Sequence, residues 1–389
     1  MPDQAVRAGH RLVAHASGRG VTKHRKVTDE QIVPLQFLRG VAATAVVVEH
    51  LLERYARRDA LPAVLPDFTT RLGQTGVATF FAISGFIMVF IALRDPVRTP
   101  TGTAFLRDRY LRVAPLYYLM TALIVLFGVA TQSLATTATR RVPNLLETIC
   151  SLTFIPHRGA NGVIQPIYML GWTLHYEMFF YLVFALSLAL LRRKAAYLLL
   201  LILVSLLLLG IRRDAPPDVW GLALATYVFT RPIMAYFAIG IVIALVRRRL
   251  AERLPVVPAP VIATSALIAL AIAAATAERM VAMPAIAVAV GCTVLLDPGL
   301  RGRAGVFSGF SRAFGDASYS IYLTHSFLLG AFAFATARLA TRGYVALGLL
   351  TVLACACCFV VGWLTWRLVE VPITTQLRGR RPKIETVAP

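Results

Sequence analysis

Apolar stretches of about 20 residues recur along the chain between Val33 and Trp366, separated by short segments rich in arginine, glycine and proline. A stretch of this length crosses the hydrocarbon core of a bilayer as one α-helix. The pattern therefore predicts an all-α fold, a polytopic membrane bundle of about ten transmembrane helices. We expect these helices at residues 33–53, 74–93, 113–131, 167–191, 195–211, 228–246, 256–274, 280–296, 318–338 and 343–366.

The distribution of basic residues predicts how this bundle is oriented. With the N-terminus in the cytoplasm, roughly two thirds of the 40 lysines and arginines fall on the cytoplasmic side. An N-in, C-in arrangement follows. The membrane domain is then expected over residues 33–373. Basic cytoplasmic tails are expected over residues 1–32, which we predict to be disordered, and over residues 374–389.

Composition narrows the classes of function. Only 15% of the residues are charged, against about 25% in soluble domains, and the net charge is +21. We interpret the excess of basic residues as topology signals and contacts to anionic membrane lipids, with no nucleic-acid partner. None of the five cysteines has metal-ligand spacing, and no metal is expected. The outer loop 132–166 holds an apolar segment too short to span, which predicts a re-entrant or interfacial helix.

Two residues in the first hydrophobic segment carry the strongest functional signal. Arg39 and His50 are costly in hydrocarbon, and such residues in membrane helices usually face polar cavities. Eleven residues make about three helical turns, so both side chains lie on one face, about 16 Å apart along the axis. His50 has the intrinsic acidity of a general base. The alternative is a structural hydrogen bond to a neighbouring helix.

Other ionisable residues extend this candidate site. Glu177 falls near the middle of a predicted span, where either a structural ion pair, for example with Arg39, or a catalytic role would explain it. Arg107, Arg109 and Arg112 crowd the cytoplasmic end of the third span. This cluster is either an orientation signal or a site for an anion such as phosphate.

Spacing along two further segments predicts which side chains face the interior. Gly76 and Gly85 give the second span small residues for close helix packing. In the ninth span, Tyr322 and His325 share a helical face with Ser318, which makes His325 a candidate cavity residue. Asp316 or Ser318 is expected to cap that helix.

Six segments together resemble the acyltransferase-3 family of bacterial membrane proteins. In order they are R-x10-H, GV-x2-FF-x-ISGF, FLR-x-R-x2-R-x2-P-x-Y, W-x-L-x2-E-x2-FY, GDASYSIYLTH and W-R-x-VE-x-P, running from about Leu35 to Pro372. The fourth segment is most similar to that of members acting on exopolysaccharides. The chain departs from the family pattern at Ala78, where an acidic residue is common, at Glu49 and at Val371.

The resemblance implies an O-acyltransferase of the bacterial inner membrane. The donor would be acyl-CoA, usually acetyl-CoA, and the acceptor a hydroxyl of a cell-surface or lipid-linked carbohydrate. By similarity, His50, Glu177 and Arg39 are the catalytic candidates. Arg107, Arg109 and Arg112 match the arginine motif associated with donor handling, and we group His325 with the donor-binding candidates.

Three alternatives stay open from the sequence. His50 acts either as a base in direct transfer or as a nucleophile that forms an acyl-histidine. A transporter or flippase for a saccharide or lipid carrier would also suit ten helices with inner charges, although the chain has no inverted repeat. A non-catalytic partner of a polysaccharide assembly complex is the third. The distance between the cytoplasmic arginines and His50 requires a donor that enters deeply.

Overall fold

The computed structural model describes residues 32–57, 65–94, 99–132, 143–159, 162–211, 216–217, 221–250, 257–296 and 307–378. This part of the chain is helical and has no β-strand, apart from one isolated bridge between Arg158 and Ile164. An all-α fold is therefore confirmed.

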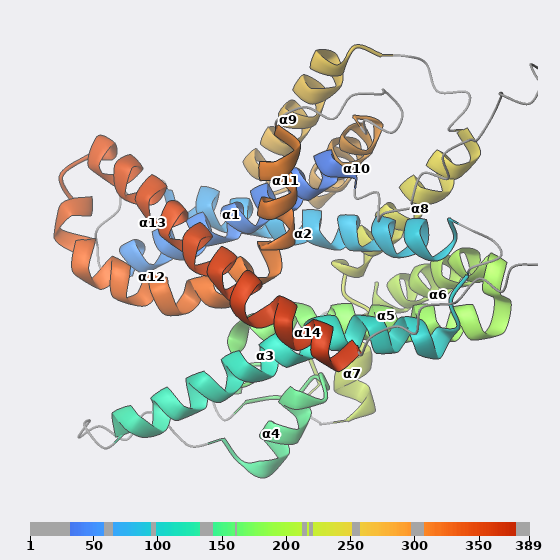
Figure 1. Cartoon of the computed structure of the whole chain (residues 1–389), viewed down its shortest axis with the longest axis horizontal. Helices are drawn as coiled ribbons and strands as arrows, with labels where there is room; N and C mark the ends of the chain where they lie inside the picture. Colours follow the sequence, from blue (N-terminus) through green and yellow to red (C-terminus); the bar gives the residue numbers. More distant parts are fainter. Residues whose placement is uncertain are drawn as a thin grey trace, which may run out of the picture. The chain divides into compact units, whose positions relative to one another are not determined.

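Each of the ten predicted segments is a helix in the structure (Figure 1). They are α1 Val33–Ala56, α2 Leu65–Ala92, α3 Gly102–Gln132, α5 Trp172–Leu191, α6 Ala195–Gly210, α8 Met234–Leu250, α9 Ala259–Ala275, α10 Arg279–Leu295, α12 Ser318–Ala340 and α13 Tyr344–Thr365.

Length and composition identify six candidate membrane spans among the described helices, or seven if one bent pair counts as a single span. One candidate runs from Met169 to Gly210 and contains both α5 and α6, while α9 and α10 have only 17 residues each. The bent pair is α7, Leu222–Phe229, followed by α8 at an angle of 52°. The chain is an integral membrane protein, whereas ten separate crossings and the N-in, C-in orientation stay predictions.

Short helices complete the fold. α4, Leu145–Leu152, is the helix expected in loop 132–166, and a capping box between Asn144 and Glu147 starts it. It packs against the middle of α3, where Tyr117 and Tyr118 donate hydrogen bonds to the carbonyls of Ser151 and Leu152. α11 covers Phe307–Asp316 and α14 covers Val371–Arg378.

Among the boundaries that differ from the prediction, two concern basic segments. The third helix begins at Gly102, well before residue 113, because Thr101 caps it and accepts a hydrogen bond from the amide of Ala104. Its three arginines therefore lie on helical turns. At the other end of the chain, α14 continues to Arg378, beyond the predicted start of the tail at residue 374. Residues 1–31 and 379–389, which hold most of both predicted tails, lie outside the described residues.

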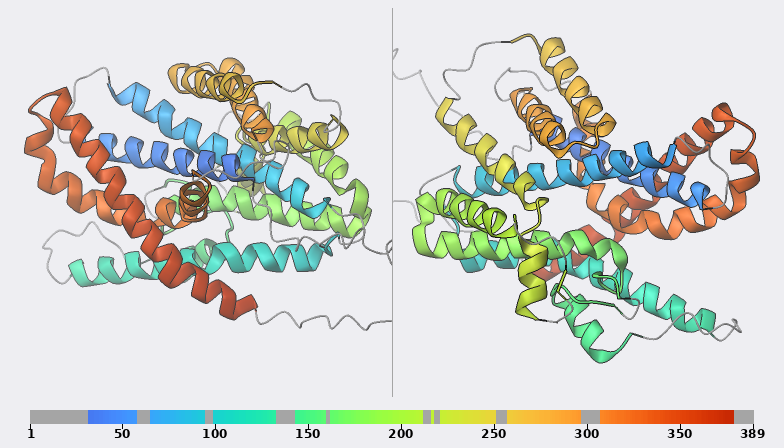
Figure 2. Two further views of the ribbon diagram at one scale, coloured as in Figure 1. Left: turned by 45° about the horizontal axis from the view of Figure 1, so that its top comes forward. Right: turned by 180° about the vertical axis from the view of Figure 1, so that it is seen from behind.

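The first helix lies at the centre of the packing. α1 contacts α2, α11 and α12, while α2 also packs on α8, and α12 pairs with α13 in an antiparallel hairpin (Figures 1 and 2). The predicted role of the small residues is confirmed. A Cβ on Gly76 would lie 2.6 Å from the carbonyl oxygen of Ala42, and one on Gly85 would lie 2.2 Å from that of Phe237. Glycine at these positions lets α2 approach both neighbours closely.

The buried apolar side chains form two clusters. The larger one is built mainly by α2, α3, α5, α6, α8 and α10, and the smaller one joins α1 to α12 and α13. The packing therefore positions α1 with its Arg39 and His50 side facing other helices of the bundle.

Candidate active site

The last turns of α1 hold a histidine and a glutamate at i, i+3 spacing. Nδ1 of His50 lies 3.2 Å from Oε2 of Glu53, and the other oxygen of Glu53 accepts a 2.6 Å hydrogen bond from Arg57. Because a carboxylate only accepts, Nδ1 of His50 carries the hydrogen, which leaves Nε2 as the basic nitrogen of the neutral ring. The hydrogen bond that Arg57 donates to Glu53 also raises the pKa of Arg57, so this exposed guanidinium stays charged.

A second imidazole lies against the first. The rings of His50 and His325 stack with centroids 5.3 Å apart and planes 15° from parallel. His325 is fully buried in α12, and its Nδ1 lies 3.2 Å from the backbone oxygen of Ile321. A carbonyl can only accept, so Nε2 of His325 is the unprotonated nitrogen, and it has no hydrogen-bond partner.

Arg54 fixes the two helices at this point. Its guanidinium donates to the backbone oxygen of His50 at 2.9 Å and to the backbone and hydroxyl oxygens of Ser326 at 3.4 and 3.3 Å. Ser326 follows His325 in the chain. The arginine therefore joins the end of α1 to α12 beside the two stacked rings.

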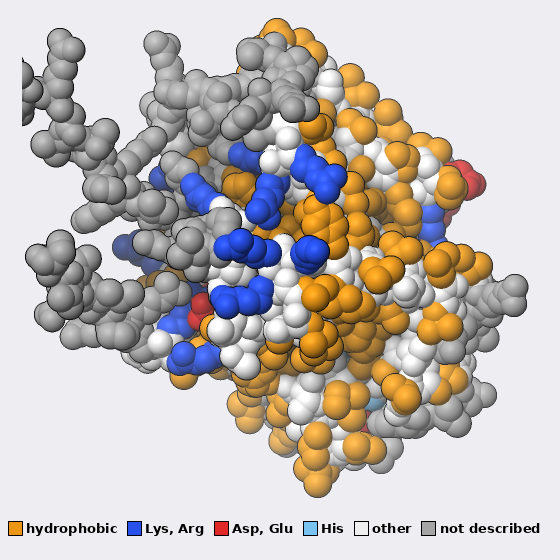
Figure 3. Space-filling view, turned by 90° about the vertical axis from the view of Figure 1, so that its right-hand side faces the viewer, with side chains coloured by type: hydrophobic (Ala, Val, Ile, Leu, Met, Phe, Trp, Pro, Cys, Tyr) orange, Lys and Arg blue, Asp and Glu red, His pale blue; other side chains and the backbone are white. Residues whose placement is uncertain are grey.

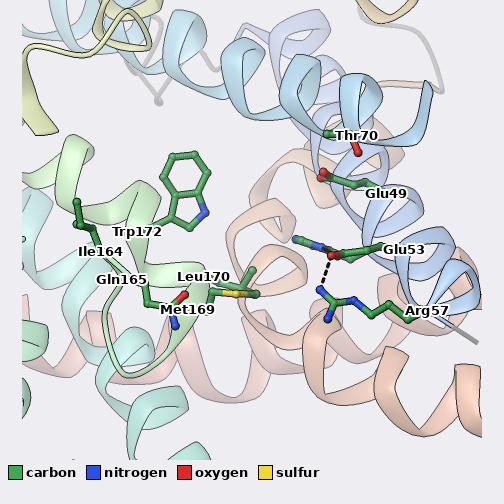
Figure 4. Close-up of a pocket in the computed structure, with 10 residues that line it drawn as sticks. Glu49, Glu53, Arg57, Thr70, Ile164, Gln165, Met169, Leu170 and Trp172 are labelled. Carbon is green, nitrogen blue, oxygen red and sulfur yellow. Dashed lines mark hydrogen bonds and ion pairs between the residues drawn. The ribbon is translucent and has the colours of Figure 1, made fainter. Parts of the chain in front are cut away.

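A cavity of about 360 Å³ opens next to His50. It lies between the end of α1 and the segment that leads into α5, so that Trp172 and Met169 face Glu49, Glu53 and Arg57 across it (Figure 4). The remaining lining residues are Thr70, Ile164, Gln165 and Leu170. His50 is thus accessible to a small polar molecule, with 19% of its side chain exposed.

At the opposite end of the shared face, Arg39 enters a different environment. Its guanidinium donates to Gln36 at 2.9 Å, and Gln36 donates in turn to Asp316 of α11 at 3.3 Å. Arg39 also lies within electrostatic range of Arg112, Glu177 and Glu370. The expected cap of α12 by Asp316 or Ser318 is wrong. Asp316 accepts from Gln36, and Ser318 donates to the carbonyl of Gly315.

The three arginines of α3 do not stay together. Arg109 and Arg112 face the interior within electrostatic range of each other, and Nε of Arg109 is buried without a hydrogen-bond partner. Arg107 is exposed and lines a second, mostly apolar cavity of about 630 Å³ with Phe154 and Phe179. Helix geometry explains the split, because residues 107 and 109 project about 160° apart.

Glu177 belongs to the arginine end of the site. Its Oε1 accepts hydrogen bonds from Tyr181 and, at 3.4 Å, from Ser84. Arg39 and Arg109 are both within electrostatic range. In the described part of the chain no direct ion pair joins Glu177 to Arg39. The two charges interact only at longer range.

Glu370 is a further residue of this site, and the sequence pattern did not predict it. It ends a π-helical turn, Trp366–Glu370, that links α13 to α14, and turns of this kind often mark functional sites. The buried carboxylate accepts a 2.6 Å hydrogen bond from Ser320 and lies within electrostatic range of Arg39 and Arg112. The motif W-R-x-VE-x-P contains it, but nothing in the residue pattern predicts the π turn.

Tyr322 stands between the two ends. Its hydroxyl hydrogen-bonds Thr173 and the carbonyl of Leu170, and it lies within electrostatic range of both Glu49 and Glu177. None of Arg39, Arg109 and Arg112 lines the cavity at His50. The site therefore has two parts, a histidine part with a cavity and an arginine part, with a tyrosine between them.

Two further buried histidines lie elsewhere. His175 is buried near His157, with ring centroids 6.3 Å apart, and does not reach His50. Among the described residues, no group of three or more histidine, cysteine, aspartate or glutamate side chains is arranged to hold a metal ion.

Comparison with known proteins identifies the family of the chain. The family model described as an acyltransferase domain matches residues 33–367. The chain is 34% identical over 270 residues to the exopolysaccharide production protein ExoZ of Rhizobium meliloti (strain 1021), covering 66% of this chain and 77% of ExoZ. It is 27% identical to acyltransferase MdmB of Streptomyces mycarofaciens, over 89% of this chain and 92% of MdmB. No solved structure matches the chain.

Proposed function

The chain belongs to this acyltransferase family, and on that premise we propose that it transfers an acyl group, most simply acetyl, from acyl-CoA to a carbohydrate hydroxyl. The observation that carries the proposal is the Glu53–His50 pair at the wall of a cavity. It is the arrangement of a general base whose second nitrogen is held by a carboxylate.

Arg39, Arg109 and Arg112 are proposed to bind the phosphates of acyl-CoA. The fit rests on the buried, unpartnered Nε of Arg109 and on the position of Arg112 within electrostatic range of both Arg39 and Arg109. Arginine suits phosphate because it donates several hydrogen bonds in a fixed plane. Arg107 is left out of this role because it lines the other cavity.

The transfer step is assigned to His50. Nε2 takes the proton from an acceptor hydroxyl as that oxygen attacks the thioester carbonyl carbon. A new C–O ester bond forms, the C–S bond breaks, and the leaving CoA sulfur takes the proton from the imidazolium. Glu53 stabilises the imidazolium through Nδ1. A base in this position contributes roughly 10²–10⁴-fold to the rate.

Glu177 and His325 take supporting roles in this scheme. Glu177 is hydrogen-bonded to Tyr181 and Ser84 beside the arginines. We propose that its negative charge partly neutralises the positive charge of these arginines. His325 stacks on His50, so we assign it to orienting the base, although its sequence position placed it among the donor-binding candidates.

The basic surface supports a proposed orientation of the protein in the membrane. Lysine and arginine side chains gather on one face of the molecule (Figure 3). Exposed arginines also follow the end of α5, at Arg192 and Arg193, and lie in the last turn of α8, at Arg248. The positive-inside rule favours this face as cytoplasmic, in a bacterial inner membrane. Arg39, near the start of α1, is then closer to the cytoplasm, and His50 is closer to the outside.

An exopolysaccharide is the acceptor class favoured by the similarity to the exopolysaccharide production protein ExoZ. The test compares surface polysaccharide from cells that carry the wild-type chain or His50→Ala. We expect O-acetyl signals in the NMR spectrum of the wild-type polymer and their loss in the variant, with equal protein in the membrane. O-acetylation that persists in the variant would overturn the scheme, and would favour the alternatives of a transporter or a non-catalytic partner.

A further inference from the structure

The cavity at His50 has two unlike walls. Trp172, Met169 and Leu170 present an indole ring and apolar side chains, while the opposite wall, formed by α1, carries carboxylates (Figure 4). At about 360 Å³ the cavity is near the lower end of ligand sites, which hold roughly 300–1,000 Å³. It suits one sugar residue whose less polar ring face packs on the indole and whose hydroxyls face α1.

Glu49 lies on the polar wall and has no role in the proposed transfer step. Its carboxylate lies directly over Gly73 of α2, where a Cβ would be 1.6 Å from Oε2. Glycine at position 73 thus makes room for the carboxylate. No hydrogen bond or ion pair joins Glu49 to another described residue, although a carboxylate has about four acceptor sites. Hydroxyl donors from a ligand would satisfy them.

The two carboxylates of this wall differ in their partners. Glu53 is bonded to Arg57, and His50 is neutral when it acts as a base. Glu49 has no bonded cation, and Arg54 lies beside the rings outside the cavity lining. When Glu49 is ionised, a second carboxylate a few ångströms away in this partly enclosed space is repelled more strongly than in water.

We propose that Glu49 makes this cavity select an uncharged or cationic sugar residue as acceptor and exclude sugar acids. Acceptor hydroxyls donate to the Glu49 carboxylate, which holds one neighbouring hydroxyl toward His50. This proposal rests on the proposed acyl transfer, and Glu49 is a specificity-determining residue within it.

The test measures binding of three glycosides to the purified full chain in detergent by saturation-transfer NMR. They are 4-nitrophenyl β-D-glucoside, the corresponding glucuronide and the corresponding 2-amino-2-deoxy glucoside. We expect the neutral and amino sugars to bind at least about tenfold more tightly than the glucuronide, a difference of about 1.4 kcal/mol. In Glu49→Gln the glucuronide should bind about as tightly as the glucoside. Asp67→Asn is the matched control, because it removes an exposed carboxylate of α2 outside the cavity lining.

Three results would overturn the proposal. They are equal binding of glucoside and glucuronide by the wild type, an unchanged ratio in Glu49→Gln, and no binding of any of the three glycosides. The order of the three affinities in the wild type tests the proposal even if the variant does not insert. Binding is read without turnover, so discrimination by charge in a protein that transfers no acetyl group would refute the proposed function, and with it the role of the sugar as acceptor, while selection of the bound sugar by Glu49 would stand.

Discussion

Each end of α1 places an ionisable side chain inside a membrane helix, His50 at one end and Arg39 at the other. The contacts that stabilise these two side chains differ. At His50 every ring contact is short and local, with Glu53 on one nitrogen, His325 on the ring face and a cavity beside it. At Arg39 the guanidinium has one direct partner, Gln36, and the surrounding charges act through space. The first arrangement sets the state of one nitrogen, and the second leaves a guanidinium N–H group, Nε of Arg109, available to an anion.

This contrast predicts that the histidine end controls the chemical step and the arginine end controls donor affinity. Variants at the two ends should therefore change different kinetic constants. The following predictions run from the largest expected effect to the smallest.

Replacing the base should have the largest effect. His50→Gln keeps a polar side chain but removes the basic nitrogen, so kcat for acetyl transfer should fall roughly 10²–10⁴-fold. Release of CoA thiol by protein in lipid nanodiscs measures it. His175→Gln, another buried histidine replaced in the same way, should keep kcat within a few fold. Equal losses in both variants would mean that the effect is structural.

Removing the carboxylate partner should have an intermediate effect. Glu53→Gln cannot stabilise the imidazolium as an ion, and hydrogen bonds to charged groups contribute about 1.5–3 kcal/mol. We expect kcat to fall about 10–100-fold with little change in KM for acetyl-CoA. Steady-state kinetics separate the two constants, and a rise in KM alone would place Glu53 outside the chemical step.

The arginine end should show the opposite pattern. Arg109→Gln and Arg112→Gln are each expected to raise KM for acetyl-CoA about tenfold, because each removes a charged donor to phosphate. Arg107→Gln is the control from the same helix, and its KM should stay near that of the wild type. If Arg107→Gln raised KM as much as the other two, the division of α3 into two faces would have no functional meaning.

The smallest effect on activity is expected for the contact between α2 and the middle of α1. Gly76→Ala would press a methyl group against the backbone of Ala42 and should lower the free energy of unfolding by about 1–3 kcal/mol. Gly128→Ala in α3 meets no atom within 4 Å and should be neutral or stabilising by up to about 1 kcal/mol. Thermal unfolding in detergent compares them. Equal stability of the two variants would show that the α1–α2 contact is not tight.

Much of this arrangement could be predicted from local pattern. The ten helices follow from apolar stretches, and the shared face of Arg39 and His50 follows from eleven-residue spacing. The division of the α3 arginines also follows from helical geometry, but only when the helix is extended back to Gly102, which requires Thr101 as its cap. With a later start, all three arginines fall in a loop and their directions are undefined.

Tertiary contacts account for what the pattern could not predict. His325 meets His50 because α12 packs on α1, and no spacing within either segment encodes that crossing. Glu53 is four residues from Arg57 and three from His50, a spacing that places the three side chains on one helical face. The predicted span ends at residue 53, so it does not extend the helix to Arg57. Glu370 reaches the arginines through a π-helical turn, which apolar periodicity does not predict.

The central claim is that His50 receives a donor from the arginine side and an acceptor from the cavity side. Sealed vesicles with the basic face outward test it most directly, with labelled acetyl-CoA added outside and 4-nitrophenyl β-D-glucoside trapped inside. The account predicts labelled acetyl-glucoside in the lumen for the wild type and none above background for His50→Gln. Lumenal product formed by His50→Gln at the wild-type rate would contradict it.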